Sequence, residues 1–271
     1  MRSVSGRQGG LLLAVTGLAL CGGAAAAEPP TGREIMERVD ARDDGDNSTQ
    51  DLEMILYDRS GNQRVRRLRA FGQDRGEDSY SLLFFLSPAD VKDTGFLTYD
   101  YDAPERDDDQ WLYLPALKKT KRIASSDKSG SFMGSDFSYA DMTERPLDDY
   151  DYSLMQESEV GGVPVWQVQS VPKTQREREE TGYEKSVLFV RKDNDVVIRS
   201  VHWVKKGKRL KYFEVGKLEQ IDGIWVATEM QMTTKRGSET EHRTTLRASN
   251  VRFNQPLAAD LFSTRQLEKG L

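Results

Sequence analysis

Extended hydrophobic runs separated by polar turn residues dominate the chain from about residue 49 onward. The runs are rich in Val, Ile, Leu and aromatic residues, a composition that is typical of β-strands. Turn residues such as Gly161-Gly162 and Asp222-Gly223 separate neighbouring runs, which predicts sequential antiparallel strands and disfavours a parallel α/β fold. We place strands at residues 51–58, 63–72, 79–87, 95–101, 110–114, 121–124, 150–158, 163–171, 183–191, 196–204, 208–220, 223–234 and 240–253.

Few segments have a helical pattern. Thr31 and Glu34 form a capping-box pair, and apolar residues then recur at helical spacing, so a short amphipathic helix is predicted over residues 31–42. Residues 176–180 predict a loop or a helical turn, and residues 256–262 predict a closing turn or short helix. A long antiparallel meander with so few helices forms either a closed barrel or a strongly curved open sheet with a helix on its concave face.

The segment from residue 110 to 141 passes from an apolar strand into a basic stretch and then into an aromatic loop. Trp111 and Tyr113 alternate with Leu112 and Leu114, so both faces of the strand carry large apolar groups that need a cover. The basic stretch holds Lys118, Lys119, Lys121 and Arg122. The loop mixes Ser and Gly with Phe132, Met133, Phe137 and Tyr139, which an ordinary solvated loop would not need.

These residues resemble the LolA-like outer-membrane lipoprotein-sorting proteins, in particular the longer branch associated with transporters of the resistance-nodulation-division type. The resemblance rests on W-x-Y-x-P at residues 111–115, the basic cluster ending at Arg122, and F-M-G-S-D-F-S-Y-A-D at residues 132–141. Weaker similarities lie at Leu86-Ser87-Pro88, Gly95-Phe96-Leu97, Val251-Arg252-Phe253-Asn254 and Leu261-Phe262-Ser263.

The resemblance implies a mainly β (α+β) fold. In such a fold a strongly curved antiparallel sheet forms an incomplete barrel, and one or a few helices and a loop cover its concave face around acyl chains. The loop at residues 125–136 then becomes a lid, with Gly130 and Gly134 supplying hinge freedom. The alternative is a connection whose aromatic residues pin it to the sheet.

Candidate cavity residues come from two strands and this loop. A set such as Leu82, Phe84 and Leu86 suits a cavity wall, although a central strand packed on both faces explains the same run. Met230 belongs to a methionine-bearing strand that suits disordered chains, although Met is also an ordinary core filler. Trp111, Tyr113, Phe132, Met133, Phe137 and Tyr139 complete the predicted cavity and lid.

The basic residues Lys118, Lys119, Lys121 and Arg122 have two interpretations. They suit contact with lipid head groups or an acidic partner, and they equally suit a solvated strand face. Charged residues make up 31% of the chain with a net charge of −5, which argues against a nucleic-acid partner.

The first residues have the features of a cleavable secretory signal. Arg2 and Arg7 precede an apolar run, and small residues end at Ala27, so we expect a signal peptide at 1–27 and a single periplasmic domain at 28–271. The run is shorter than the roughly 20 residues of a membrane-spanning helix, so no transmembrane segment is expected in the mature chain. The bulky Leu20 argues against lipidation of Cys21, the single cysteine.

Catalytic motifs are absent from the sequence. There are two histidines, and neither G-x-S-x-G nor H-E-x-x-H nor a phosphate-binding glycine loop occurs, so we expect no enzyme, metal site or cofactor. We interpret His202 as a residue on a strand surface.

The expected function is that of a periplasmic carrier. It would bind acyl chains of a lipid or lipoprotein and pass them toward the outer membrane, and the resemblance implies an inner-membrane transporter and an outer-membrane acceptor as partners. The alternative is a sensor or adaptor on the same scaffold, which binds a protein partner and regulates envelope signalling or a transporter. A periplasmic regulator of envelope-stress signalling also resembles this fold.

Overall fold

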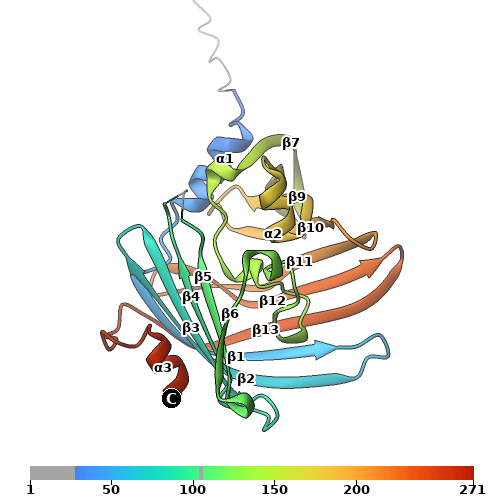
Figure 1. Cartoon of the computed structure of the whole chain (residues 1–271). Helices are drawn as coiled ribbons and strands as arrows, with labels where there is room; N and C mark the ends of the chain where they lie inside the picture. Colours follow the sequence, from blue (N-terminus) through green and yellow to red (C-terminus); the bar gives the residue numbers. More distant parts are fainter. Residues whose placement is uncertain (1–27, 104–105) are drawn as a thin grey trace, which may run out of the picture.

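The strands of the chain form one antiparallel sheet (Figure 1). The computed structural model describes residues 28–103 and 106–271, and the 13 strands of this range follow the order β6-β5-β4-β3-β2-β1-β13-β12-β11-β10-β9-β8-β7. The expected signal peptide and Cys21 lie outside the described residues. The strands are β1 (Asn47–Tyr57), β2 (Gln63–Arg75), β3 (Asp78–Ser87), β4 (Gly95–Asp100), β5 (Asp109–Leu114), β6 (Lys119–Arg122), β7 (Tyr150–Val160), β8 (Val163–Pro172), β9 (Tyr183–Arg191), β10 (Val197–Val204), β11 (Arg209–Ile221), β12 (Ile224–Arg236) and β13 (Glu239–Phe253).

Each predicted strand corresponds to one strand of the sheet. The start of β1 differs most, because Asn47 and Ser48 pair with Gln73 and Gly72 of β2 although the polar sequence there hides the alternation. Sequential strands pair within β1–β6 and within β7–β13, and the pairing of β1 with β13 joins these two halves into one sheet.

The helices are few, as predicted. Helix α1 (Gly32–Asp40) begins at the capping box of Thr31, and α2 (Gln175–Thr181) forms at the charged interruption. The turn predicted within residues 256–262 is present at Ala259 and Asp260, and a helix that was not predicted, α3 (Thr264–Lys269), follows because the Ser263 side chain caps its first turn. No helix in the described ranges is both long and apolar enough to span a membrane.

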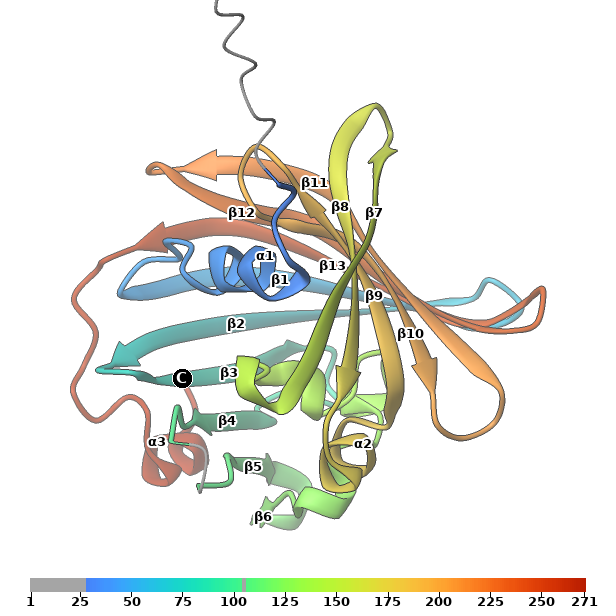
Figure 2. The same ribbon diagram turned by 90° about the horizontal axis from the view of Figure 1, so that it is seen from above.

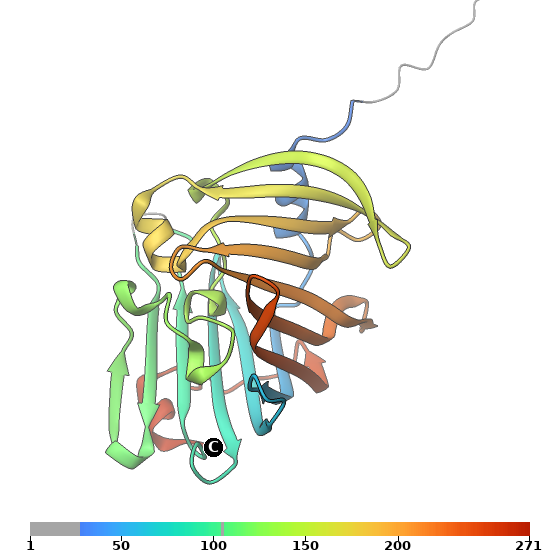
Figure 3. The ribbon, with the colours of Figure 1, turned by 90° about the vertical axis from the view of Figure 1, so that its right-hand side faces the viewer.

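The sheet curves strongly but does not close. Figures 2 and 3 show β3–β6 and β7–β10 on opposite sides of a concave space. The order of strands ends at β6 and β7, which do not pair with each other in the described part of the chain. The architecture is therefore the incomplete barrel that the resemblance implied, and the closed barrel is excluded.

Separate segments cover the two faces of the sheet. Helix α1 packs on β7 and β8, and the segment at residues 123–149, which we call the inner loop, lies within the concave space (Figures 2 and 3). Helix α3 packs on the outer face against β4 and β5 (Figure 1). Gly32 allows α1 to start directly on β7, because a Cβ atom there would lie 2.7 Å from the backbone nitrogen of Ser153.

Candidate functional site

A row of polar side chains crosses the concave face from β9 to β13. The strand register places Ser186 beside His202, His202 beside Lys211, Lys211 beside Thr234, and Thr234 beside His242. Directly opposite residues of antiparallel strands project from the same face of a sheet. We call Ser186, His202, Lys211, Thr234 and His242 the polar row.

Apolar residues lie two positions further along the same strands. Leu188 follows Ser186, Phe213 follows Lys211, and Phe213 pairs with Met232 of β12. The next row contains Met230, which pairs with Leu246 of β13. The concave face therefore carries an apolar area directly beside the polar row, and Met230, a predicted cavity residue, belongs to this area.

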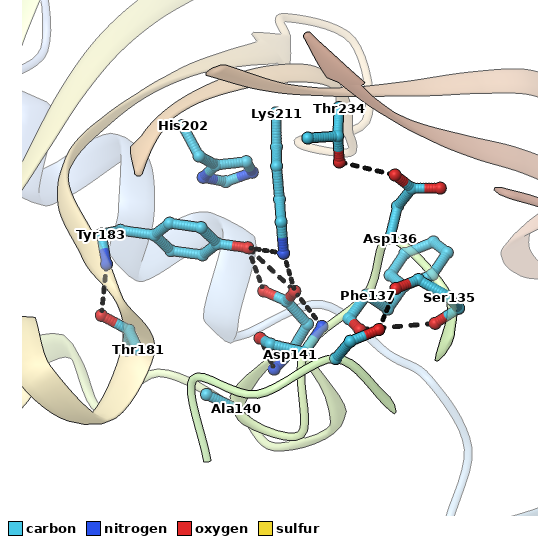
Figure 4. Close-up of polar contacts among 12 residues, drawn as sticks. Ser135, Asp136, Phe137, Ala140, Asp141, Thr181, Tyr183, His202, Lys211 and Thr234 are labelled. Carbon is cyan, nitrogen blue, oxygen red and sulfur yellow. Dashed lines mark hydrogen bonds and ion pairs between the residues drawn. The ribbon is translucent and has the colours of Figure 1, made fainter. Parts of the chain in front are cut away.

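Two buried carboxylates of the inner loop reach the polar row, and Asp136 is the first. Its Oδ1 accepts a hydrogen bond from Thr234 Oγ1 at 2.5 Å (Figure 4), and its Oδ2 accepts one from Thr244 Oγ1 at 2.7 Å. His242 Nδ1 lies 2.7 Å from the same Oδ2 atom. Asp136 thus attaches the middle of the inner loop to β12 and β13.

Asp141 is the second carboxylate, and its partners surround it (Figure 4). Tyr183 Oη lies 3.0 Å and 2.9 Å from its two oxygens, and Lys211 Nζ lies 3.8 Å from Oδ2. Arg145 of the same loop pairs with Oδ1 at 3.2 Å, and the backbone N–H of Ser138 donates to Oδ2 at 2.8 Å. The carboxylate is therefore shared between the loop and strands β9 and β11.

Burial and neighbouring charges together set the protonation states in this cluster. Burial alone would raise the pKa of Asp141, but Lys211 and Arg145 outweigh it and hold this pKa below the ordinary value. Burial lowers the pKa of Lys211 and, with Asp141, raises that of Tyr183, which keeps the phenol protonated as a donor. Burial, followed by the charge of Arg145, lowers the pKa of His202 to about 3, so its ring is neutral near pH 7.

The interpretation of His202 as a strand-surface residue is wrong. Its ring is 4% exposed, lies 2.7 Å from both Ser186 Oγ and Ser200 Oγ, and stacks on Tyr183. The alternation in Val201-His202-Trp203 predicts that His202 lies on the opposite face of β10 from its two neighbours. The sequence does not show that another segment covers the face that carries His202.

The aromatic residues of the inner loop form part of the core. Phe132 is 1% exposed, and its ring centroid lies 6.2 Å from that of Phe85 and 5.0 Å from that of Phe96. Tyr139 packs edge-on against Phe132 at 5.6 Å, and Phe137 is also buried. Met133 packs against the same cluster with a left-handed backbone. In this conformation the inner loop is a plug that fills the concave side of β1–β5.

The predicted cavity wall on β3 faces the other way. Leu82 and Phe84 are buried with Leu267 of α3 on the outer face, and Leu86, at an irregularity in the pairing of β3 with β2, is 37% exposed. The intervening Phe85 contacts the inner loop. The expectation that Leu82, Phe84 and Leu86 line one space with the loop is therefore wrong, because Leu82 and Phe84 pack with Leu267 of α3 and Leu86 is exposed.

Trp111 and Tyr113 belong to the same outer cluster as Leu82 and Phe84. Their neighbours Leu112 and Leu114 pack on the concave side, so both faces of β5 are indeed covered by apolar contacts. The predicted set therefore divides: Phe132, Met133, Phe137, Tyr139 and Met230 lie on the concave side, and the five residues of β3 and β5 do not.

The four predicted cations follow β5 at the edge of the sheet. Lys118 adopts a left-handed conformation in the turn, and Lys119, Lys121 and Arg122 belong to the edge strand β6. Arg122 Nε donates to Asp109 at 2.6 Å, and Lys121 Nζ lies 3.6 Å from Asp127. Contact of this basic edge with head groups or a partner stays a prediction.

Sequence patterns did not predict a functional role for Asp136, Asp141, Tyr183 or Lys211. One signal was available, because Lys211 shares a strand face with Phe213 and Val215, so a charge directly adjoins an apolar pair. Within the described residues no group of three His, Cys, Asp or Glu side chains is placed to hold a metal ion.

Comparison with known proteins agrees with this architecture. A family model described as "Uncharacterized protein" matches residues 77–269. Among proteins with curated descriptions, none matches this sequence. The chain is similar to a crystal structure of a LolA superfamily protein from Nitrosomonas europaea at 15% identity, with 88% and 100% of the two chains covered and a TM-score of 0.66, which shows the fold.

Two further crystal structures are similar in sequence as well. A DUF1329 family protein from Desulfovibrio piger is 34% identical, with 87% of this chain and 97% of that chain covered and a TM-score of 0.79. An outer membrane lipoprotein-sorting protein domain from Vibrio parahaemolyticus is 32% identical, with 88% and 98% covered and a TM-score of 0.79. The chain therefore belongs to the DUF1329 family and has the fold of the LolA superfamily.

Proposed function

We propose that the protein is a carrier, not an enzyme, and that it binds acyl chains of a lipid or lipoprotein between the concave face and the inner loop. The main observation behind the proposal is the kind of segment that covers the concave face of the sheet. Leu246, the partner of Met230, packs against the cluster that contains Phe132 of the inner loop, and the described strands form a single sheet, so the cover here is a connecting segment and not a second sheet. Movement of one such segment can expose a continuous apolar surface without breaking strand pairing.

The energetics of burial suit a carrier. One acyl chain of ordinary length offers on the order of 10 kcal/mol of gross transfer free energy at roughly 0.8 kcal/mol per methylene. In this protein the chain replaces side chains such as Phe132 and Phe137, which already fill the apolar surface. Capture is then an exchange of apolar contacts and needs neither a covalent step nor a nucleotide.

The proposal extends to location and partners. The Vibrio parahaemolyticus relative is described as an outer membrane lipoprotein-sorting protein domain, which supports a role in the periplasm. The carrier then receives its cargo from an inner-membrane transporter and delivers it to an outer-membrane acceptor.

Lipid extraction of purified protein followed by mass spectrometry tests this function. We expect co-purified acyl lipids and saturable uptake of a fluorescent fatty acid. Met232→Asp, which places a charge on the buried concave face, should reduce uptake, whereas Gln231→Asp on the opposite face of β12 should not. Failure of the wild-type protein to retain or take up any acyl compound would refute the carrier, and recovery of a lipid-free protein with a bound protein partner would favour the sensor.

A further inference from the structure

We propose that Tyr183 and Lys211 form a binding site for an anionic head group, a carboxylate or a phosphate, and that Asp141 of the inner loop occupies this site as an internal competitor. We call the space bounded by Tyr183 Oη and Lys211 Nζ the head-group site. The inference rests on the proposed carrier function and adds the charge class of the cargo.

The donors of this site belong to the sheet. Tyr183 lies at the start of β9 and Lys211 in β11, so both remain in place when the inner loop moves. The Asp141 carboxylate that they bind belongs to the loop, and Tyr183 Oη approaches it at 2.9 Å. A ligand carboxylate or phosphate placed where the Asp141 carboxylate now lies would meet the same two donors.

The surroundings match an amphiphile rather than a free anion. Phe213 lies two residues after Lys211 on the same face of β11, and it pairs with Met232. Further along the strands, Val215 pairs with Met230. An acyl chain attached to a head group at Lys211 would therefore run directly over the apolar rows of the concave face.

Exchange of one anion for another explains how such a site can open. A buried ammonium that loses its partner is costly, because the charge stays out of water with no anion to offset it. When an anionic ligand replaces Asp141, Lys211 and Tyr183 keep a partner, and the released carboxylate regains water. A neutral head group leaves Lys211 with the phenol of Tyr183 at 3.2 Å but with no anionic partner there, so the site discriminates by charge.

The neighbouring groups support this assignment. His202 is neutral between Ser186 and Ser200 and adds no charge, and Asp136 is occupied by Thr234, Thr244 and His242. A cavity of about 200 Å³ is lined by Ala140, Arg145 and Thr181, among others. The cavity lies beside the loop segment that carries Asp141, because Ala140 and Arg145, a partner of Asp141, belong to its lining.

Competition among three long-chain compounds tests the inference. Palmitate, hexadecyl phosphate and hexadecanol are used to displace a pyrene-labelled fatty alcohol from the wild-type protein. We expect both anions to bind at least about tenfold more tightly than hexadecanol, the effect of one charge-assisted hydrogen bond. Sodium acetate and inorganic phosphate serve as free anions, and binding of either with the affinity of palmitate would overturn the assignment to a lipid head group.

Substitutions test which side chains produce the preference for anionic head groups. Lys211→Met should abolish the preference for the anions, Tyr183→Phe should reduce it, and Asp141→Asn should raise the affinity for palmitate more than that for hexadecanol. Lys185→Met is the matched control, because Lys185 projects from the other face of β9, over Trp203. Thermal melts establish that each variant is folded, and Tyr183→Phe and Asp141→Asn decide the outcome if Lys211→Met does not fold.

The binding results distinguish failure of the proposed carrier function from failure of the head-group site. If the wild-type protein binds no acyl compound, the proposed function is refuted. If it binds all three with equal affinity, or if Lys211→Met and Tyr183→Phe keep the full preference, the carrier stands and the head-group site is refuted.

Discussion

Tyr183 Oη lies 3.0 Å and 2.9 Å from the two carboxylate oxygens of Asp141, which joins strand β9 to the inner loop at a buried position. The other end of the inner loop is attached differently, through the packing of Phe132 on Phe85 and Phe96. Apolar packing requires a large surface to be re-covered when it opens, whereas a hydrogen-bonded ion can exchange one partner for another. The Asp141 end is therefore the part of the loop at which a ligand can compete.

Removal of the Asp141 carboxylate should destabilise the protein strongly. Asp141→Ala leaves Lys211 and Arg145 facing each other without their shared anion, and loss of one member of a buried ion pair costs about 3–5 kcal/mol. Urea denaturation at pH 7 measures the change. Asp193→Ala is the control, since Asp193 pairs with Arg191 at an exposed turn, and we expect it to cost less than about 1 kcal/mol. Equal losses for the two variants would contradict the burial of the Asp141 pair.

His202 should make the protein less stable as the pH falls. Its pKa is about 3 in the folded protein and close to 6.5 in an unfolded chain, so between these values the unfolded state binds a proton that the folded state does not. Stability from this residue is complete above pH 6.5 and is lost as the pH falls from 6.5 toward 3. Between pH 7 and pH 5 the loss amounts to about 2 kcal/mol.

The comparison of wild type with His202→Gln isolates this contribution, because the effects of the carboxyl groups on the pH dependence largely cancel in the difference. Urea denaturation at pH 7 and pH 5 should show a steeper loss for the wild-type protein by about 2 kcal/mol. His242→Gln is the matched control at the other end of the polar row. An identical pH dependence for wild type and His202→Gln would mean that the ring is hydrated.

The strands were predictable because local signals specify them. Runs rich in Val, Leu and aromatic residues identified β3 and β9, and turn residues such as Gly161 and Gly162, both with positive φ, marked the hairpins. The capping box of Thr31 marked the start of α1 for the same reason, since its two hydrogen bonds are made within one turn.

The cover of each face was not predictable from local signals. Period-two alternation separates Phe84 from Phe85 but does not say which of them meets α3 and which meets the inner loop. The anchors of the loop depend on contacts across long separations, such as that of Asp136 with Thr244. Asp141 was within the segment that carries the family resemblance, yet its partners Tyr183 and Lys211 lie on strands that the sequence does not connect to it.

Phe132 should be as important for stability as a residue of a central strand. Phe132 and Phe84 are each 1% exposed, so Phe132→Ala and Phe84→Ala should each cost about 3–5 kcal/mol in thermal or urea denaturation. Leu117→Ala is the control, because Leu117 is 62% exposed in the turn after β5, and a change below about 0.5 kcal/mol is expected. A Phe132→Ala protein as stable as Leu117→Ala would show that the loop is only loosely held at this end.

The packing of α3 on the sheet should produce an energetic coupling between substitutions at Gly95 and Leu267. A Cβ atom at residue 95 would lie 2.6 Å from Leu267 Cδ1 and 2.9 Å from Phe84 Cε1, so Gly95→Ala should cost about 1–3 kcal/mol through overpacking. Leu267→Ala alone should cost about 2–5 kcal/mol, because it leaves a cavity beneath α3. In the double variant the new methyl group enters the space that the leucine vacated, so the two losses should sum to more than the measured loss by at least about 0.5 kcal/mol. Urea denaturation of the four proteins of this cycle measures the difference, and strictly additive losses would mean that α3 shifts away from β4 instead of packing on Gly95.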